Sequence, residues 1–168
     1  SIAIARSPFR MRRILAFMDP WAHRHDVGYQ ITESLMSIGS GGLTGLGLGD
    51  GRQKLFFLPE AHTDFIFAGL AEQWGFIGSL ALLLLYAYLI SKGLRLARDA
   101  RDMFTMVTSF GIVSMMALQV VINIGMVTGI MPVVGIPLPL LSYGGSSMVM
   151  NMLAVGLLLN IQMHRYMY

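Results

Sequence analysis

Three long apolar stretches restrict what this chain can fold into more than any other feature of the sequence. They cover residues 65–91, 103–127 and 147–163, and the second of them contains no charged residue. A helix that crosses a lipid bilayer needs about 20 predominantly apolar residues, and a shorter stretch can still cross if the bilayer adapts. We therefore expect an all-α, polytopic membrane protein with about three transmembrane helices.

The composition supports a membrane protein and excludes several other classes. Hydrophobic residues make up 55% of the chain and charged residues only 12%, which is too apolar for an ordinary soluble domain. The chain has no cysteine, so neither disulfides nor thiolate chemistry are available. The net charge of +3 suits anionic lipid, and the apolar stretches argue against a nucleic-acid partner.

The chain divides into two regions. Residues 64–168 form the transmembrane region, and residues 1–63 are expected to form an extracytoplasmic loop region with short amphipathic helices and a glycine-rich loop. In the loop region, "SPFRMRRILAFMDP" and "GYQITESLMSIG" have helical patterns, whereas "GSGGLTGLGLGDG" is too rich in glycine for a stable helix.

The distribution of basic residues predicts the topology. The segment "SKGLRLARDARD" between the first two spans is expected to be a cytoplasmic loop, because short basic loops stay inside. Residues 1–64 and 128–146 then face outward. The 128–146 loop contains Pro132, Pro137 and Pro139, and we expect it to dip into the protein and help to wall a cavity.

The glycine-rich loop allows more than one interpretation. It is not a Walker A motif, because Gly51 is followed by Arg52, Gln53 and Lys54. A flexible surface loop is the preferred interpretation over a nucleotide site. A bent loop that delivers Arg52, Gln53 and Lys54 to an anionic head group remains a third possibility. No metal ligands are assigned, because the histidines follow no zinc-site spacing.

Polar residues near the last two spans are expected to have structural roles. Gln119 and Asn123 are four residues apart and share a helix face, which favours hydrogen bonds from helix to helix. Ser146 or Ser147 is expected to cap the N-terminus of the third span.

The stretch "LPEAHTDFIF" places Glu60, His62 and Asp64 where the chain enters the first span. An ionisable residue at membrane depth indicates a functional site, because it is costly to keep there otherwise. The alternative is that Asp64 caps the N-terminus of the span. Desolvation would raise the pKa of Asp64 and nearby Arg52 or Lys54 would lower it, and the residues alone leave both interpretations open.

The order of several motifs resembles the SEDS family (shape, elongation, division and sporulation) of bacterial cell-wall synthesis, which includes FtsW, RodA and SpoVE. The matching stretches cover nearly the whole chain and are most similar to FtsW: "SIGSGGLTGLGLGDGRQKLFFLPEAHTDFIFAGLAEQWGFIG" and "NIGMVTGIMPVVGIPLPLLSYGGSS", with "DPW" and "GYQ" before them. The family has about ten spans, so the resemblance implies that this chain is the C-terminal part. Gln73 and Val134 depart from the family pattern, and neither lies in the HTDF motif.

The resemblance implies a peptidoglycan glycosyltransferase in the bacterial cytoplasmic (inner) membrane, with its catalytic loop facing outward. Such a protein polymerises lipid II into glycan strands during cell division and releases undecaprenyl pyrophosphate. A class B penicillin-binding protein and other division proteins are the implied partners. The essential aspartate of the HTDF motif corresponds to Asp64, which would be the catalytic base of an inverting transfer.

The remaining candidate residues would bind or position the lipid-linked substrate around Asp64. They are Glu60, His62, Arg52, Gln53, Lys54, Ser142 and Tyr143. A divalent cation, Mg²⁺ or Mn²⁺, is an expected cofactor, because the departing pyrophosphate needs positive charge.

Two alternatives from other classes remain. A lipid II flippase would need access from both faces of the membrane and would form no bond. A division scaffold would tolerate replacement of Asp64. We expect this part of the protein to be inactive by itself, because three spans do not enclose a cavity for a lipid-linked disaccharide.

Overall fold

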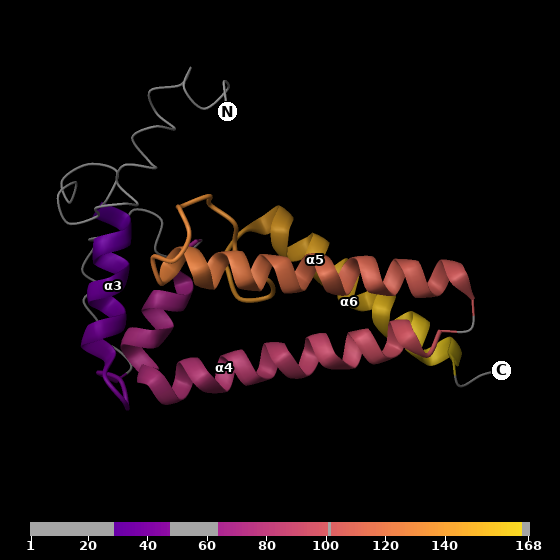
Figure 1. Cartoon of the computed structure of the whole chain (residues 1–168), viewed down its shortest axis with the longest axis horizontal. Helices are drawn as coiled ribbons and strands as arrows, with labels where there is room; N and C mark the ends of the chain where they lie inside the picture. The colour runs from indigo at the N-terminus through magenta and orange to yellow at the C-terminus, as the bar shows by residue number, and fades with distance from the viewer. Residues whose placement is uncertain (1–28, 48–63, 101, 166–168) are drawn as a thin grey trace, which may run out of the picture.

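The computed structural model describes residues 29–47, 64–100 and 102–165. Every regular element in these ranges is a helix, which confirms the all-α prediction (Figure 1). The helices are α3 (Tyr29–Gly41), α4 (Ile66–Arg98), α5 (Met103–Val127) and α6 (Gly145–Arg165).

Three of these helices are long and apolar enough to cross a membrane. They are α4, α5 and residues Gly145–Met163 of α6. Their outer surfaces carry many exposed large apolar side chains, as the lipid-facing side of a span requires. The described part of the chain therefore belongs to a multi-pass membrane protein.

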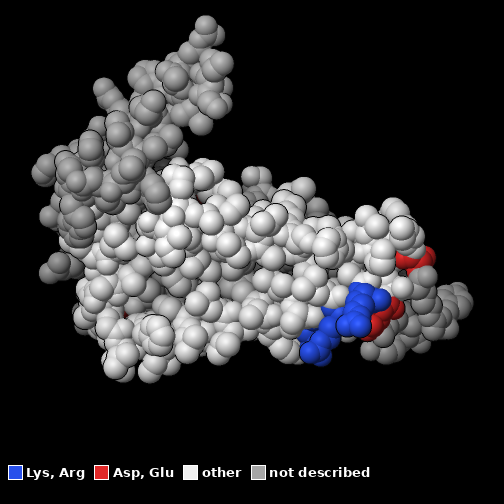
Figure 2. Space-filling model, in the orientation of Figure 1, with Lys and Arg blue, Asp and Glu red and all other residues white. Residues whose placement is uncertain are grey.

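The observed ends of the helices correct two expectations. The basic segment after residue 91 is not a loop, because α4 continues to Arg98 and includes Lys92 and Arg95. Lysine and arginine favour helices, and their long side chains can bring their charges to the edge of a membrane. Figure 2 shows these charges gathered, together with acidic side chains, at one end of a face whose described atoms are otherwise almost all uncharged.

The start of α6 also differs from its prediction. The helix begins at Gly145, and the carbonyl of Gly144 already accepts the amide of Met148 at 2.8 Å. Ser146 and Ser147 therefore lie inside the first turn, and the expectation that one of them precedes the helix as its cap is wrong.

α4 and α5 form an antiparallel pair that runs side by side, and α6 crosses the pair obliquely (Figure 1). The connection between α4 and α5 comprises only residues 99–102. The buried core lies where the pair meets the loop that follows α5. Its members are Phe65, Phe67, Ala68, Tyr86, Val120, Met126, Val127 and Leu138.

α4 is interrupted at Gly75, which has φ 65° and ψ −161°. The first part of α4 runs beside α3 and then turns into the long second part (Figure 1). Such a break frees backbone groups that must find partners in an apolar environment. The glycine-rich segment after α3 provides them. The four bonds join Leu46 N to Glu72 O, Gly47 N to Gln73 O, Phe76 N to Gly42 O and Ile77 N to Leu43 O, at 3.0, 3.2, 2.9 and 3.2 Å.

This docking requires glycine at the contact points. A Cβ atom added at Gly45 would overlap the carbonyl of Gln73, and one added at Gly75 would overlap the backbone amide of Gly45. Up to Gly47 the glycine-rich segment therefore lies at the surface, as the preferred interpretation predicted, but its backbone is hydrogen-bonded to α4 and is not a free loop. The rest of that segment lies outside the described residues.

The loop between α5 and α6 turns inward, as its prolines predicted. Leu138 and Pro139 are almost completely buried. The hydroxyl of Tyr86, midway along α4, donates a hydrogen bond to the carbonyl of Pro139 at 2.5 Å. This bond holds the loop against the interior of the helix pair.

Candidate functional site

Asp64 lies directly before the start of α4 and is half-buried. The N-cap residue of α4 is Phe65, whose side chain makes no capping hydrogen bond. Phe65 is 1% exposed and belongs to the buried core. The N-cap position of α4 is therefore taken by Phe65 and not by Asp64, which lies one residue before it.

Asn123 of α5 fixes the backbone at Asp64. Its side-chain amide nitrogen donates to the carbonyl of Asp64 at 2.9 Å and to the carbonyl of Ile136 at 2.7 Å. The residue is fully buried. One carboxamide thus joins the entrance of α4 to the loop that follows α5, segments that are far apart in the sequence.

Gly135 lies next to the carboxylate of Asp64. Its φ of 75° is in the region that favours glycine, and a Cβ atom there would lie 3.1 Å from Oδ2 of Asp64. The backbone of this loop therefore lies close to the carboxylate of Asp64, and a larger residue at position 135 would displace that carboxylate.

The two candidate residues near the end of the same loop differ in exposure. Ser142 is 3% exposed, and its hydroxyl oxygen accepts a hydrogen bond from the amide of Leu138 at 2.7 Å. It shapes the turn that buries Leu138. Tyr143 is 82% exposed and can present its ring to a ligand or a partner.

The remaining predicted site residues lie outside the described residues. They are Glu60, His62, Arg52, Gln53 and Lys54. Their roles stay predictions. Within the described ranges no group of three histidine, cysteine, aspartate or glutamate side chains converges on a point that could hold a metal ion. A divalent cation at this site also stays a prediction.

Sequence reasoning noticed Asn123 but assigned it the wrong partners. It predicted hydrogen bonds between helices together with Gln119, whereas Asn123 binds two loop carbonyls. Oε1 of Gln119 is buried and, among the described residues, has no hydrogen-bond partner. The signal in the sequence was an asparagine in an apolar span, and its partners depend on how distant loops fold.

The chain matches a known protein family over almost its full length. The family is described as "Cell cycle protein", with the name FTSW_RODA_SPOVE, and the match covers residues 1–167. The chain is 51% identical to stage V sporulation protein E of Bacillus subtilis over 158 residues, which is 94% of this chain and 43% of the relative. It is 48% identical to a probable peptidoglycan glycosyltransferase FtsW of Coxiella burnetii over 158 residues, which is 92% of this chain and 42% of the relative.

Two solved structures resemble the fold. One, described as "Structural coordination of polymerization and crosslinking by a peptidoglycan synthase complex", has a TM-score of 0.78 and 31% identity, and the match covers 99% of this chain and 45% of the other. The other is a variant of the rod shape determining protein RodA of Thermus thermophilus. It has a TM-score of 0.61 and 38% identity, and the match covers 80% of this chain and 41% of the other.

The chain spans less than half the length of these relatives. The match to the family nevertheless covers all four described helices and the loops that hold Asp64. The chain therefore belongs to the family of FtsW, RodA and SpoVE and is similar to FtsW.

Proposed function

We propose that the full-length protein containing this chain is a peptidoglycan glycosyltransferase that polymerises lipid II during cell division. The observation that carries the proposal is the fixed position of Asp64, whose backbone is held by Asn123 and whose carboxylate lies against Gly135. The relatives named as probable peptidoglycan glycosyltransferases support it, as does the resemblance to a structure described as a peptidoglycan synthase complex.

In the proposed reaction Asp64 acts as the general base. Its carboxylate takes the proton from the acceptor 4-hydroxyl, whose oxygen forms a bond to the anomeric carbon of the donor. The bond from that carbon to the pyrophosphate oxygen breaks, and undecaprenyl pyrophosphate leaves with the electron pair. Attack on the opposite side from the leaving group inverts the anomeric centre. A carboxylate fixed by its surroundings is suited to this step, because small displacements of reacting groups are costly.

The predicted surroundings complete the proposal. Glu60 and His62 would position Asp64, and Arg52, Gln53 and Lys54 would bind the lipid-linked substrate near the pyrophosphate. Mg²⁺ or Mn²⁺ would neutralise the leaving group. The exposed ring of Tyr143 would contact the substrate or a class B penicillin-binding protein. The site would face outward from the bacterial cytoplasmic membrane, because the basic end of α4 is expected to stay inside.

The test is lipid II polymerisation by the full-length protein with its penicillin-binding partner, comparing the native protein with Asp64→Asn. The substitution keeps the size of the side chain and removes the base, so the rate should fall by about 10²–10⁴-fold. Asp102→Asn is the matched control, because Asp102 is an exposed aspartate outside the spans and its capping acceptor is retained. The rate of this control should stay near that of the native protein.

The outcomes separate the three functional classes. Polymer at the native rate from Asp64→Asn would contradict the base assignment and favour a scaffold. Absence of polymer from the native complex, combined with movement of lipid II across proteoliposome membranes, would favour a flippase.

A further inference from the structure

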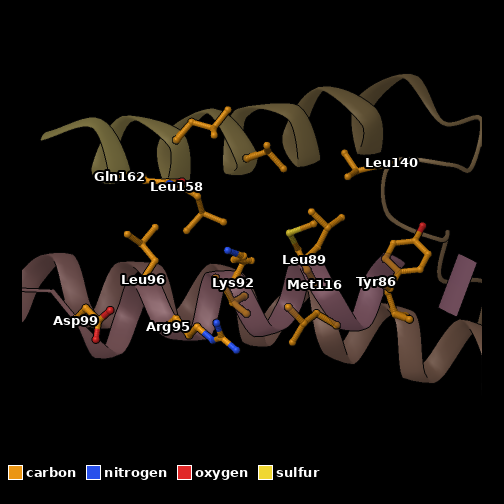
Figure 3. Close-up of a pocket in the computed structure, with 16 residues that line it drawn as sticks. Tyr86, Leu89, Lys92, Arg95, Leu96, Asp99, Met116, Leu140, Leu158 and Gln162 are labelled. Carbon is orange, nitrogen blue, oxygen red and sulfur yellow. The ribbon is translucent and has the colours of Figure 1, made fainter. Parts of the chain in front are cut away.

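A mostly apolar cavity lies at the end of the helix pair away from Asp64. It has a volume of about 310 Å³ and is lined by the second half of α4 together with α5 and α6. Tyr86 and Leu140 close one end, and Asp99 and Gln162 mark the other (Figure 3). The fourteen residues from Tyr86 to Asp99 correspond to about 20 Å along a helix. The cavity therefore extends over a depth similar to one leaflet of a bilayer, which is about 15 Å of hydrocarbon.

The chemistry of the cavity changes along its length. Its deep part, toward Tyr86 and Leu140, is lined by apolar side chains that include Leu89 and Met116 (Figure 3). Lys92 and Arg95 join the lining in the last two turns of α4. In Figure 3 the nitrogen of Lys92 extends toward α6. Asp99 also lines the cavity, but it is exposed and lies beyond the end of α4.

This arrangement is complementary to an anionic lipid. The aliphatic walls stabilise an alkyl chain. A phosphate level with the C-terminal end of α4 lies near the positive charges of Lys92 and Arg95 and the single negative charge of Asp99, so the net charge there is positive. An additional protein helix is a poorer occupant, because an apolar helix over Lys92 and Arg95 would bury two charges without partners. Water alone is also a poor occupant of an apolar cavity.

We propose that this cavity binds an anionic phospholipid of the surrounding membrane, with one acyl chain between α4, α5 and α6 and the phosphate beside Lys92 and Arg95. The lipid-linked substrate of the proposed reaction is a different ligand, since its reacting sugar must reach Asp64 at the other end of the pair. Lipid occupancy at this cavity would hold α6 against α4 and α5. The inference does not depend on the glycosyltransferase assignment, because lipid binding is measured without polymerisation.

The test uses the full-length protein in nanodiscs that contain phosphatidylglycerol and phosphatidylcholine in equal amounts. Native mass spectrometry after release from the nanodiscs counts the retained lipids of each class. We expect preferential retention of phosphatidylglycerol, with affinity about fivefold weaker in Arg95→Gln and weaker still when Lys92→Gln is added. Arg98→Gln is the matched control, because Arg98 is exposed on the same helix and does not line the cavity. Its lipid retention should equal that of the native protein.

Two further measurements place the lipid. A phosphatidylglycerol with a photoreactive acyl chain should crosslink to peptides of α5 and α6 that line the cavity, and Leu158→Trp should reduce this crosslinking by filling the space. Equal retention of both lipid classes, an equal loss in Arg98→Gln, or crosslinks confined to other helices would each overturn the proposal. Retention of a polyprenyl pyrophosphate in place of phosphatidylglycerol would overturn it as well.

Discussion

The side-chain amide of Asn123 lies 2.9 Å from the backbone carbonyl of Asp64 and holds the entrance of α4 against α5. The same nitrogen donates to Ile136, in the loop whose Gly135 lies beside the carboxylate of Asp64. In the proposed reaction Asn123 would therefore be a positioning residue, since its amide holds the backbone of the proposed base.

Replacement of Asn123 by alanine should lower the rate of polymerisation without preventing membrane insertion. It leaves two carbonyl groups without their donor, and each unpaired buried group costs about 1–3 kcal/mol. A shift of Asp64 by about 1 Å can lower the rate by about 10²-fold. The measurement is kcat per amount of monodisperse protein, with the thermal midpoint of unfolding recorded in parallel.

Gln119→Ala is the control for this prediction, because Gln119 lies one turn away on α5 and its buried Oε1 has no partner among the described residues. Its kcat should remain near that of the native protein. Equal losses of kcat in both variants would show that Asn123 has only a general packing role.

The docking of the glycine-rich segment on α4 predicts that Gly75→Ala is strongly destabilising. Its φ and ψ are in a region that is essentially restricted to glycine, where another residue costs about 1–3 kcal/mol, and the new Cβ would overlap the amide of Gly45. Gly111→Ala in α5 is the control, because nothing lies within 4 Å of its added Cβ. It should be neutral or stabilising by about 0.5–1 kcal/mol. Thermal unfolding in detergent, followed by the loss of monodisperse protein, compares the two variants.

The sequence predicted the helices well and their contacts poorly. The second span was predicted at 103–127, which are the bounds of α5, because a charge-free stretch followed by a glycine and prolines leaves few other boundaries. The end of α4 was predicted too early, because the basic residues after residue 91 indicated a loop although they also favour helices.

The break in α4 and the partners of Asn123 were not predictable from local patterns. Gly75 alone in an apolar stretch does not indicate an interrupted helix, since its freed backbone groups are paired only when residues 42–47 fold against it. Similarly, Asn123 finds its acceptors at Asp64 and Ile136 only after both loops are in place. These features depend on tertiary contacts, and the periodicity and composition of the sequence carry no information about such contacts.

The bond between Tyr86 and Pro139 predicts that Tyr86→Phe loosens the loop between α5 and α6. The substitution keeps the ring in the core and leaves the buried carbonyl of Pro139 without this donor, at a cost of about 1–3 kcal/mol. Tyr88→Phe is the control, because Tyr88 is exposed and its ring, which lies 5.5 Å from Nζ of Lys92, is retained. Hydrogen exchange of peptides from residues 132–142 should become faster in Tyr86→Phe alone, and unchanged exchange would contradict the role of this bond.

The capping carboxylate of Asp102 predicts that the stability of the first turn of α5 depends on pH. Its carboxylate accepts a hydrogen bond from the amide of Thr105 at 2.8 Å and caps the helix. The hydrogen bonds with Thr105 lower the pKa of Asp102 below its ordinary value of 3.8. The capping contribution is therefore fully present above this ordinary value and is lost as the pH falls through the lower pKa of the folded protein.

The measurement is the protection of the Thr105 amide from hydrogen exchange, relative to Asp102→Asn at each pH. Asparagine retains an oxygen acceptor but does not titrate in this range, so the protection in Asp102→Asn should not change with the protonation of residue 102. The native protein should keep its protection at neutral pH and lose it only below about pH 3.8, whereas Asp102→Ala should be poorly protected throughout. Loss of protection in the native protein well above that pH would contradict a lowered pKa at Asp102.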